Sequence, residues 1–354
     1  MGWWDRVVGR FFGPAGAGSA AGPSADQPAV AALDAPPEPA PEPAEQPAEQ
    51  NASAWWLVEG ATLREPAAVK RPDLSAEAIA LEELLVSHFD GHDLEIPTLP
   101  HVPQRVLSRL RSRDCTVADL AREISEDQVV AAAVLRTCNS PMFRGLEKIT
   151  ALTPAVARLG SRALQTLMMH QSLRAAMFHS KSGDNDLANI LWTRSLAAAV
   201  VMHELAPLTT VEREDAFLIG LLHDIGNVMV LRLVRTHERM AGTRIDLEAF
   251  EYLCHECHQE FGELIARAWK LPGVLASLIA GHHDRPHPGD PLATERWLVQ
   301  LADMIIALLG YAPHAPYDLL NSLPAGELGL ANDAAFAATL PQLPARVEHL
   351  LATL

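Results

Sequence analysis

Apolar side chains recur at helical spacing in one segment after another from Ile96 onward, and no segment alternates as a strand would. Thr116, for example, is a good N-cap for a helix whose Leu120 and Ile124 would face inward. Hydrophobic residues make up 49% of the chain but aromatic residues only 5%, a balance that favours helices over sheets. The sequence therefore predicts an all-α fold.

The N-terminal part has a different composition. Residues 1–12 place Trp3, Trp4 and other apolar side chains on one face of a short amphipathic helix, and docking and a frayed end both remain open for it. The Pro-, Ala- and Glu-rich chain that follows cannot bury a core and is expected to be mostly disordered. The predicted organisation is an amphipathic segment (1–12), a linker (13–74), a folded domain (75–310) with a first lobe (75–183) and a second lobe (184–310), and a helical tail (311–354).

Charge and cysteine content exclude several classes of protein. A net charge of −16 argues against a nucleic-acid binder and against broad contact with anionic lipid. Four cysteines in 354 residues do not make a disulfide framework, which fits a reducing compartment. We find no apolar run of transmembrane length and no signal peptide. A cytoplasmic protein is expected, with membrane contact through residues 1–12 as a weak alternative.

An apolar helical run at residues 216–222 ends in the adjacent pair His223 and Asp224. Burying both side chains is costly unless something binds them. A divalent metal ion would bind one imidazole nitrogen and one carboxylate oxygen. A plain hydrogen bond between the two at a helix end would also satisfy them, and for the pair alone this second interpretation is the better one.

Further histidines and acids lie in similarly apolar helical segments. Helical bundles build metal cages from imidazoles and carboxylates contributed by several helices. Alternatively, the histidines are structural and bond the backbone, and His282 and His283 simply line a loop. The candidate ligands are His223, Asp224, His258, His282, His283 and Asp303.

A second group of metal-binding residue types is Cys254, Cys257 and His258, which would share one face of a helix. A structural zinc site needs a fourth ligand, and Cys115 and Cys138 lie in the other lobe without paired spacing. We therefore interpret Cys254 and Cys257 as core residues.

The order His-Asp, His, His-His, Asp on successive helices resembles the HD superfamily of metal-dependent phosphohydrolases. The likeness narrows to the HDOD branch through six short motifs, which span roughly residues 96–286. The motifs are Ile96-Pro97-Thr98-Leu99-Pro100, Asn139-Ser140, Ala157-Arg158-Leu159-Gly160, Glu251…His258…Gly262, Trp269-Lys270-Leu271-Pro272 and His282-His283. The resemblance implies a two-lobed helical HDOD domain, a kind of module that bacteria use for regulation or scaffolding without established catalysis.

One departure from the catalytic HD pattern matters. The resemblance implies a first histidine ligand near position 194, where this chain has Arg194, and the second lobe lacks the Gly-Tyr-Pro signature of related cyclic-dinucleotide phosphodiesterases. A guanidinium cannot ligate a metal and repels a nearby dication. We expect Arg194 to stand in for the metal and to pair with Asp224 or Asp303.

These features predict a non-catalytic regulatory HDOD module, with no cofactor and a degenerate cleft able to take a small ligand. By resemblance its partners are signalling proteins of two-component or cyclic-dinucleotide pathways, not nucleic acid. The alternative is a metal-dependent phosphohydrolase acting on nucleotides or cyclic dinucleotides. In that case the six candidate ligands would hold Mn, Fe, Mg or Zn and activate water.

Overall fold

The computed structural model describes residues 55–58, 60–66, 69–89, 95–140, 143, 148–178, 186–313 and 315–353. The chain divides into two compact units, Met1–Ala54 and Trp55–Leu354. The predicted amphipathic segment (1–12) and the predicted linker up to residue 54 lie outside the described residues. All described residues belong to the second unit.

Helices account for the regular backbone. Within the described residues there are two isolated β-bridges and no strand, which confirms the all-α prediction. The α-helices are α2 (Ala76–Phe89), α3 (His101–Leu110), α4 (Val117–Ser125), α5 (Gln128–Cys138), α6 (Leu152–Met177), α7 (Asp186–Leu205), α8 (Arg213–Leu222), α9 (Asn227–Ala241), α10 (Leu247–Ala268), α11 (Gly273–Gly281), α12 (Ala293–Leu308), α13 (Leu323–Glu327), α14 (Ala334–Thr339) and α15 (Leu343–Thr353). Short 3₁₀ helices are η1 (Ala206–Leu208), η2 (Leu319–Asn321) and η3 (Leu340–Gln342).

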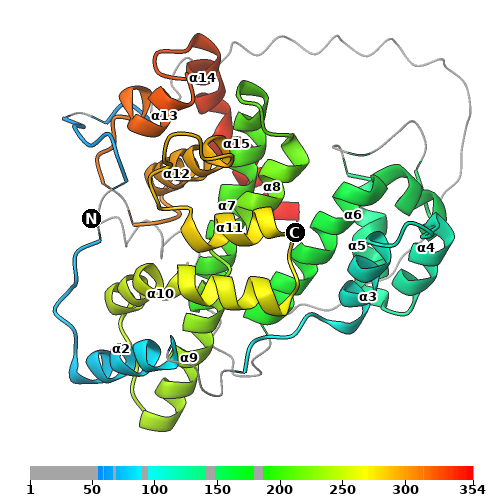
Figure 1. Cartoon of the computed structure of the whole chain (residues 1–354), viewed down its shortest axis with the longest axis horizontal. Coiled ribbons are helices and arrows are strands. Elements are labelled where there is room, and N and C mark those ends of the chain that lie inside the picture. The colour runs from blue at the N-terminus through cyan, green and yellow to red at the C-terminus, as the bar shows by residue number, and fades with distance from the viewer. Residues whose placement is uncertain are drawn as a thin grey trace, which may run out of the picture. The chain divides into compact units, whose positions relative to one another are not determined.

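The first lobe is a bundle in which α3, α4 and α5 pack against α6, at the right of Figure 1. Thr116 begins α4 through a capping box with Asp119, and the Asp127 side chain caps α5. The helix α6 changes direction at Gly160, whose φ of 71° lies in the left-handed region. Local sequence signals therefore set the helix boundaries of this lobe.

The second lobe is formed by α7 to α12. The most extensive contact in it joins α7 and α8, because Gly220 lets the two helices approach closely. A Cβ at Gly220 would lie 2.7 Å from the Ala198 carbonyl oxygen, closer than real contacts allow. The run Ala197–Ala199 on α7 is fully buried against this approach. Small residues thus bring together the two helices that support the end of α8.

The helix α2 belongs with the second lobe, so the prediction that placed it in a first lobe (75–183) is wrong. It packs against α9 and α10, with Leu81 and Leu85 fully buried. The Tyr252 hydroxyl on α10 donates a hydrogen bond to Glu82 at 3.0 Å. The apolar face of α2 packs against helices that are distant in sequence. Apolar periodicity alone does not identify such a neighbour.

The predicted boundaries at residues 74 and 310 also need correction. The tail helices α13, α14 and α15 pack on α7 and α12 and bury Phe336 and Val347 completely. Leu57 and Leu63 form isolated bridges with the tail residues Asp318 and Tyr317. The described part of the predicted linker (from residue 55) and the predicted tail (311–354) are therefore integral to the second lobe.

Residues 213–241 are long and apolar enough to cross a membrane by length and composition, and 72% of the apolar window is buried inside the protein. The stretch contains α8 and α9, separated by a turn at residues 223–226. Such burial and interruption are typical of core helices.

The two lobes meet along α6 and at the lead-in to α3. Helix α6 contacts α8 and α9, and the His170 ring on α6 lies 4.7 Å from the Trp192 ring on α7. The Trp269 indole Nε1, at the end of α10, donates to the Pro97 carbonyl oxygen at 2.6 Å. In each contact a buried ring of one lobe, His170 or Trp269, touches the other lobe.

His170 should make stability depend on pH. Burial of its ring, with repulsion from Arg174 and Arg136, lowers the pKa of His170 from 6.5 to about 4. The unfolded chain therefore binds the proton first, so this group's stabilisation is complete above pH 6.5 and is lost as the pH falls toward 4.

The free energy of unfolding should fall as the pH is lowered from 6.5 to 4. We expect His170→Phe, which keeps the packing on Trp192, to make this decrease smaller by up to about 3 kcal/mol. The measurement is urea denaturation across this pH range, with the exposed His287→Asn as the control. Parallel pH profiles for His170→Phe and the unsubstituted protein would contradict the assignment.

Candidate metal centre

The centre is built on the turn that joins α8 to α9. The helix α8 ends at Leu222, and His223 is its C-terminal cap. Three residues later, the backbone of Gly226 lies directly against α10, so that a Cβ there would collide with the His258 carbonyl oxygen and approach the Gly262 nitrogen to 2.6 Å. The turn therefore meets α10 backbone to backbone, which brings Asp224 beside His258.

Three histidines of the centre are oriented by their own helices. Nδ1 of His223 lies 2.9 Å from the Gly220 carbonyl oxygen, Nδ1 of His258 lies 2.9 Å from that of Cys254, and Nδ1 of His282 lies 3.1 Å from that of Ile279. A carbonyl oxygen only accepts, so each Nδ1 must carry the proton. Nε2 of each ring then points inward, and a ring without a second proton offers a lone pair there, the arrangement usual for metal-binding histidines.

The three Nε2 atoms surround one carboxylate oxygen. Oδ1 of Asp224 lies 3.6 Å from Nε2 of His223, 3.4 Å from that of His258 and 3.5 Å from that of His282. Nε2 of His258 and Nε2 of His282 are 3.1 Å apart. Two lone pairs at this distance repel unless a proton or a metal cation lies between them, so the donor set calls for a positive charge.

The candidate ligands fall into two groups that share His282. In the first, one ligand atom from each of Asp224, His258, His282 and His283 lies within 4.8 Å of every other. In the second, the same holds for His223, His282 and Asp303. The structure thus brings all six predicted residues together, from the α8–α9 turn, α10, the end of α11 and α12.

His223 has an unusual environment in the second group. Its Nε2 lies 3.3 Å from Oδ1 of Asp303, yet this buried atom has no well-formed hydrogen bond to either neighbouring carboxylate. Burial lowers the pKa of His223, but the charges of Asp224 and Asp303 outweigh it and raise the pKa to about 9. Without a metal, a proton on His223 supplies positive charge to this half of the centre.

The remaining titratable groups favour a neutral imidazole set around a carboxylate. Burial opposes ionisation of Asp224, but the rings of His223, His258 and His282 hold its pKa well below the usual range. Burial lowers the pKa of His258 to about 4, and burial and the His282 ring lower the pKa of His283. At neutral pH, His258 and His283 therefore keep the lone pairs that a metal needs.

Arg194 does not pair as predicted. Its side chain is 9% exposed, and Nη2 lies 2.5 Å from Glu251 on α10, while Nε donates to the Tyr311 carbonyl oxygen at 3.3 Å. Burial lowers the pKa of Arg194, but Glu251 and then Asp224 raise it above its usual value. The expected pairing with Asp224 or Asp303 is wrong, because Glu251 is in direct contact and neutralises the guanidinium.

Glu251 and Gln300 are two residues that the candidate set lacked. Glu251 stands two helical turns before His258 on α10, a spacing that could have pointed to it. The Gln300 amide donates to the His282 carbonyl oxygen at 2.9 Å and to that of Asp284 at 3.0 Å. It fixes the backbone that carries His282 and His283, and its place one turn before Asp303 is its only sequence signal.

Cys254 and Cys257 are buried and free. Burial raises the pKa of Cys254 well above its usual value and that of Cys257 to about 12, so both thiols stay protonated. Among the described residues, the possible metal groups include neither cysteine. The interpretation of these two as core residues agrees with their burial.

Comparison with known proteins settles the family. The model of the HDOD domain matches residues 96–285, more than half of the chain. This chain belongs to the HDOD family. An uncharacterized protein of Treponema pallidum (strain Nichols) is 23% identical over 274 residues, which are 74% of this chain and 52% of that protein. The chain thus spans about half the length of this relative.

Solved structures share the HDOD fold. An HDOD domain protein of unknown function from Geobacter sulfurreducens has a TM-score of 0.56 and 24% identity, over 77% of this chain and 98% of its own. A candidate metal-dependent phosphohydrolase from Shewanella amazonensis SB2B has a TM-score of 0.60 and 18% identity, over 77% and 100%. A candidate signal transduction protein from Marinobacter aquaeolei VT8 has a TM-score of 0.56 and 19% identity, over 81% and 67%. At these identities the likeness confirms the fold.

The close approach at Gly226 gives a test of how the centre is assembled. A methyl group at this position must push α10 away from the His223–Asp224 turn. We expect Gly226→Ala to lower the free energy of unfolding by about 2 kcal/mol or more and to weaken Mn²⁺ binding. Denaturant melts and Mn²⁺ titration measure the two effects.

Gly273→Ala is the matched control, because Gly273 begins α11 and a Cβ there meets nothing within 4 Å. It should match the unsubstituted protein in both measurements. Equal stability of the Gly226→Ala and Gly273→Ala proteins would contradict the backbone contact.

Proposed function

We propose that this HDOD protein is a regulatory module of bacterial signal transduction whose centre binds one divalent metal ion without hydrolysing a substrate. The observation that supports the proposal is the inequality of the two halves of the centre. The half at Asp224, His258, His282 and His283 offers four ligand atoms within mutual reach. The half at His223 and Asp303 has only one further ligand within reach, His282, and the first half already uses it.

The donor set fits a borderline metal ion. Three imidazoles and one carboxylate suit Fe or Zn, and less strongly Mn, whereas Mg prefers oxygen ligands alone. The fixed Nδ1 protons and the facing Nε2 atoms of His258 and His282 support this choice. A bound ion would act as a Lewis acid and would lower the pKa of a coordinated water.

The Arg194–Glu251 pair supplies no ligand for a second metal ion. By family resemblance, position 194 is where a catalytic relative would supply another imidazole. Here a buried guanidinium fills that place, and it interacts electrostatically with Asp224, the carboxylate shared by the surrounding histidines. An arginine offers no lone pair to a metal ion, so the group of His223, His282 and Asp303 gains no further ligand from position 194.

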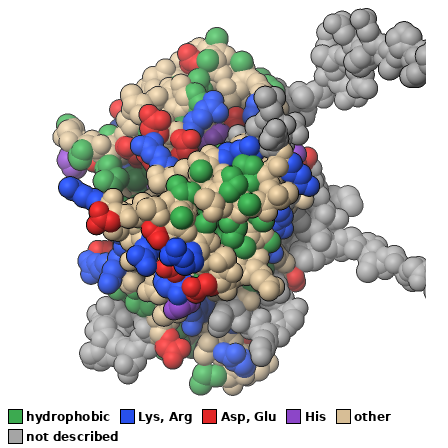
Figure 2. Space-filling view, turned by 90° about the vertical axis from the view of Figure 1, so that its right-hand side faces the viewer, with side chains coloured by type: hydrophobic (Ala, Val, Ile, Leu, Met, Phe, Trp, Pro, Cys, Tyr) green, Lys and Arg blue, Asp and Glu red, His purple; other side chains and the backbone are tan. Residues whose placement is uncertain are grey.

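A regulatory role requires a surface that partners can recognise. On the side of the molecule that Figure 2 shows, apolar side chains gather near the middle, with charged residues of both signs around them. Two exposed valines belong to the first lobe, Val117 on α4 at 40% and Val129 on α5 at 67% exposure. The apolar area in Figure 2 suits a protein partner, and we propose signalling proteins of two-component or cyclic-dinucleotide pathways, in the cytoplasm.

The alternative is a metal-dependent phosphohydrolase acting on nucleotides or cyclic dinucleotides. The convergence of all six candidate ligands favours it, as does the name of the Shewanella amazonensis protein. In that case His223 and Asp303 would also hold a metal ion.

One pair of measurements separates the two functions. The full chain is titrated with Mn²⁺, and hydrolysis of bis(p-nitrophenyl) phosphate, nucleotides and cyclic dinucleotides is then assayed with Mn²⁺ or Fe²⁺ present. We expect about one Mn²⁺ per chain, a loss of at least tenfold in affinity for Asp224→Ala, and no turnover above that of Asp224→Ala. Turnover that Asp224→Ala abolishes would overturn the regulatory proposal in favour of the enzyme.

A further inference from the structure

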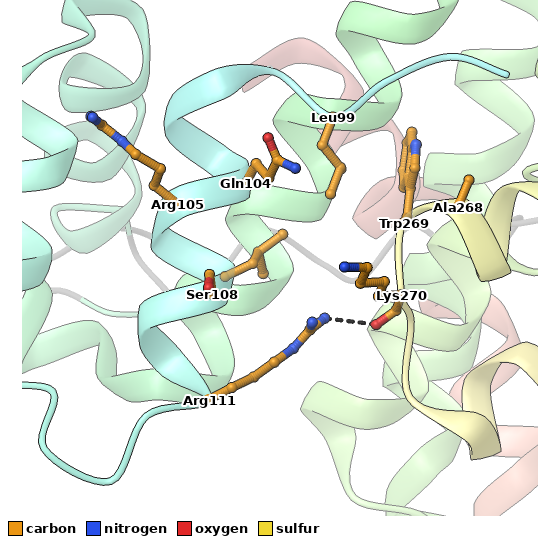
Figure 3. Close-up of a pocket in the computed structure, with 9 residues that line it drawn as sticks. Leu99, Gln104, Arg105, Ser108, Arg111, Ala268, Trp269 and Lys270 are labelled. Atoms are coloured by element: carbon orange, nitrogen blue, oxygen red, sulfur yellow. Dashed lines mark hydrogen bonds between the residues drawn. The ribbon is translucent and has the colours of Figure 1, made fainter. Parts of the chain in front are cut away.

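A cavity of about 260 Å³ lies where the first lobe meets the end of α10, and none of the six candidate metal ligands lines it. Figure 3 shows α3 on one side and the segment after α10 on the other. Leu99 and Trp269 form an apolar part of the wall, and Gln104, Ser108, Arg111 and Lys270 supply polar groups. The cavity is therefore a second, separate site with its own chemistry.

The charge in this cavity is positive, although the chain as a whole carries −16. Among its lining residues, Arg105 is neutralised by ion pairs with Glu123 and Glu126, and Figure 3 shows it directed away from the others. No described carboxylate lines the cavity, and no described ion pair involves Arg111 or Lys270. Two solvent-exposed cations without a described ion-pair partner therefore lie at one place.

The backbone of Lys270 points to a role for its side chain. Lys270 has φ of 52°, and it follows α10 at the position of a Schellman motif, where Leu271 N–H donates to the Ala266 carbonyl oxygen at 2.9 Å. Glycine usually occupies this position, because the left-handed backbone is strained for a lysine. The strained backbone directs the ammonium group into the cavity (Figure 3).

Two hydrogen bonds hold the walls together across the lobes. Nη2 of Arg111 donates to the Lys270 carbonyl oxygen at 2.8 Å, and Nε1 of Trp269 donates to the Pro97 carbonyl oxygen at 2.6 Å. The first of these uses part of the guanidinium fork and leaves other N–H groups available. A ligand bound here would contact both lobes and strengthen their contact.

We propose that this cavity binds a small phosphorylated molecule, with its phosphate between Arg111 and Lys270. The cavity offers hydrogen-bond donors from Arg111, Lys270, Ser108 and Gln104. A carboxylate has two oxygens to accept them, whereas a phosphate monoester has three terminal oxygens and can use more of these donors. Leu99 and Trp269 would contact its organic part. The volume is below the range of about 300–1,000 Å³ of most ligand pockets, which favours a mononucleotide or smaller over a cyclic dinucleotide.

The test is calorimetric titration of the full chain with AMP, inorganic phosphate and adenosine in the presence of EDTA. The chelator removes any metal, so that phosphate cannot bind at the metal centre and the result does not depend on the function proposed above. AMP, phosphate or both should bind, which separates a nucleotide ligand from the free anion. Adenosine, which lacks the phosphate, should not.

The variants locate the binding. Lys270→Gly removes the ammonium while relieving the backbone strain, so it should weaken binding at least tenfold without lowering the melting temperature. Arg111→Gln should weaken binding similarly. The exposed Arg113→Gln changes the net charge equally outside the cavity and should have no effect.

Three results would overturn the proposal. They are no binding of AMP or phosphate, unchanged binding in both Lys270→Gly and Arg111→Gln, and an equal loss in Arg113→Gln.

Discussion

The centre depends on the hydrogen bonds between histidine Nδ1 atoms and carbonyl oxygens of their own helices. At His223, His258 and His282 these bonds fix a proton on the outer nitrogen and direct Nε2 toward Asp224. The Nε2 atoms of His258 and His282 then face each other at 3.1 Å, which is unfavourable without a cation between them. The helices thus hold the rings in an orientation that is stable only when a positive charge lies between them.

Close helix contacts make this geometry attainable. Gly220 allows α8 to lie against α7, and Gly226 and Gly262 allow the following turn to meet α10 and α11, where any larger residue would collide. The same contacts bury the rings so completely that a bound charge would be poorly screened. At the buried position 194 the arginine pairs with Glu251 and offers no ligand atom to the centre.

The sequence predicted what depends on local signals. Apolar periodicity and the cap at Thr116 specified helices, and the His-Asp pair after an apolar run marked the residues that the structure brings together. It did not predict contacts that depend on how helices rotate against one another. The partner of Arg194 and the placement of α2 on α9 and α10 are of this kind, because periodicity defines a face without naming its neighbour.

The central claim is that one cation, and not two, is held at the half of the centre formed by Asp224, His258, His282 and His283. The most direct measurement is anomalous X-ray diffraction from crystals of the full chain grown with Mn²⁺. We predict a single anomalous peak, bonded to ligand atoms of these four residues, with the Arg194–Glu251 pair intact. No peak there, or a second peak between His223 and Asp303, would contradict the account.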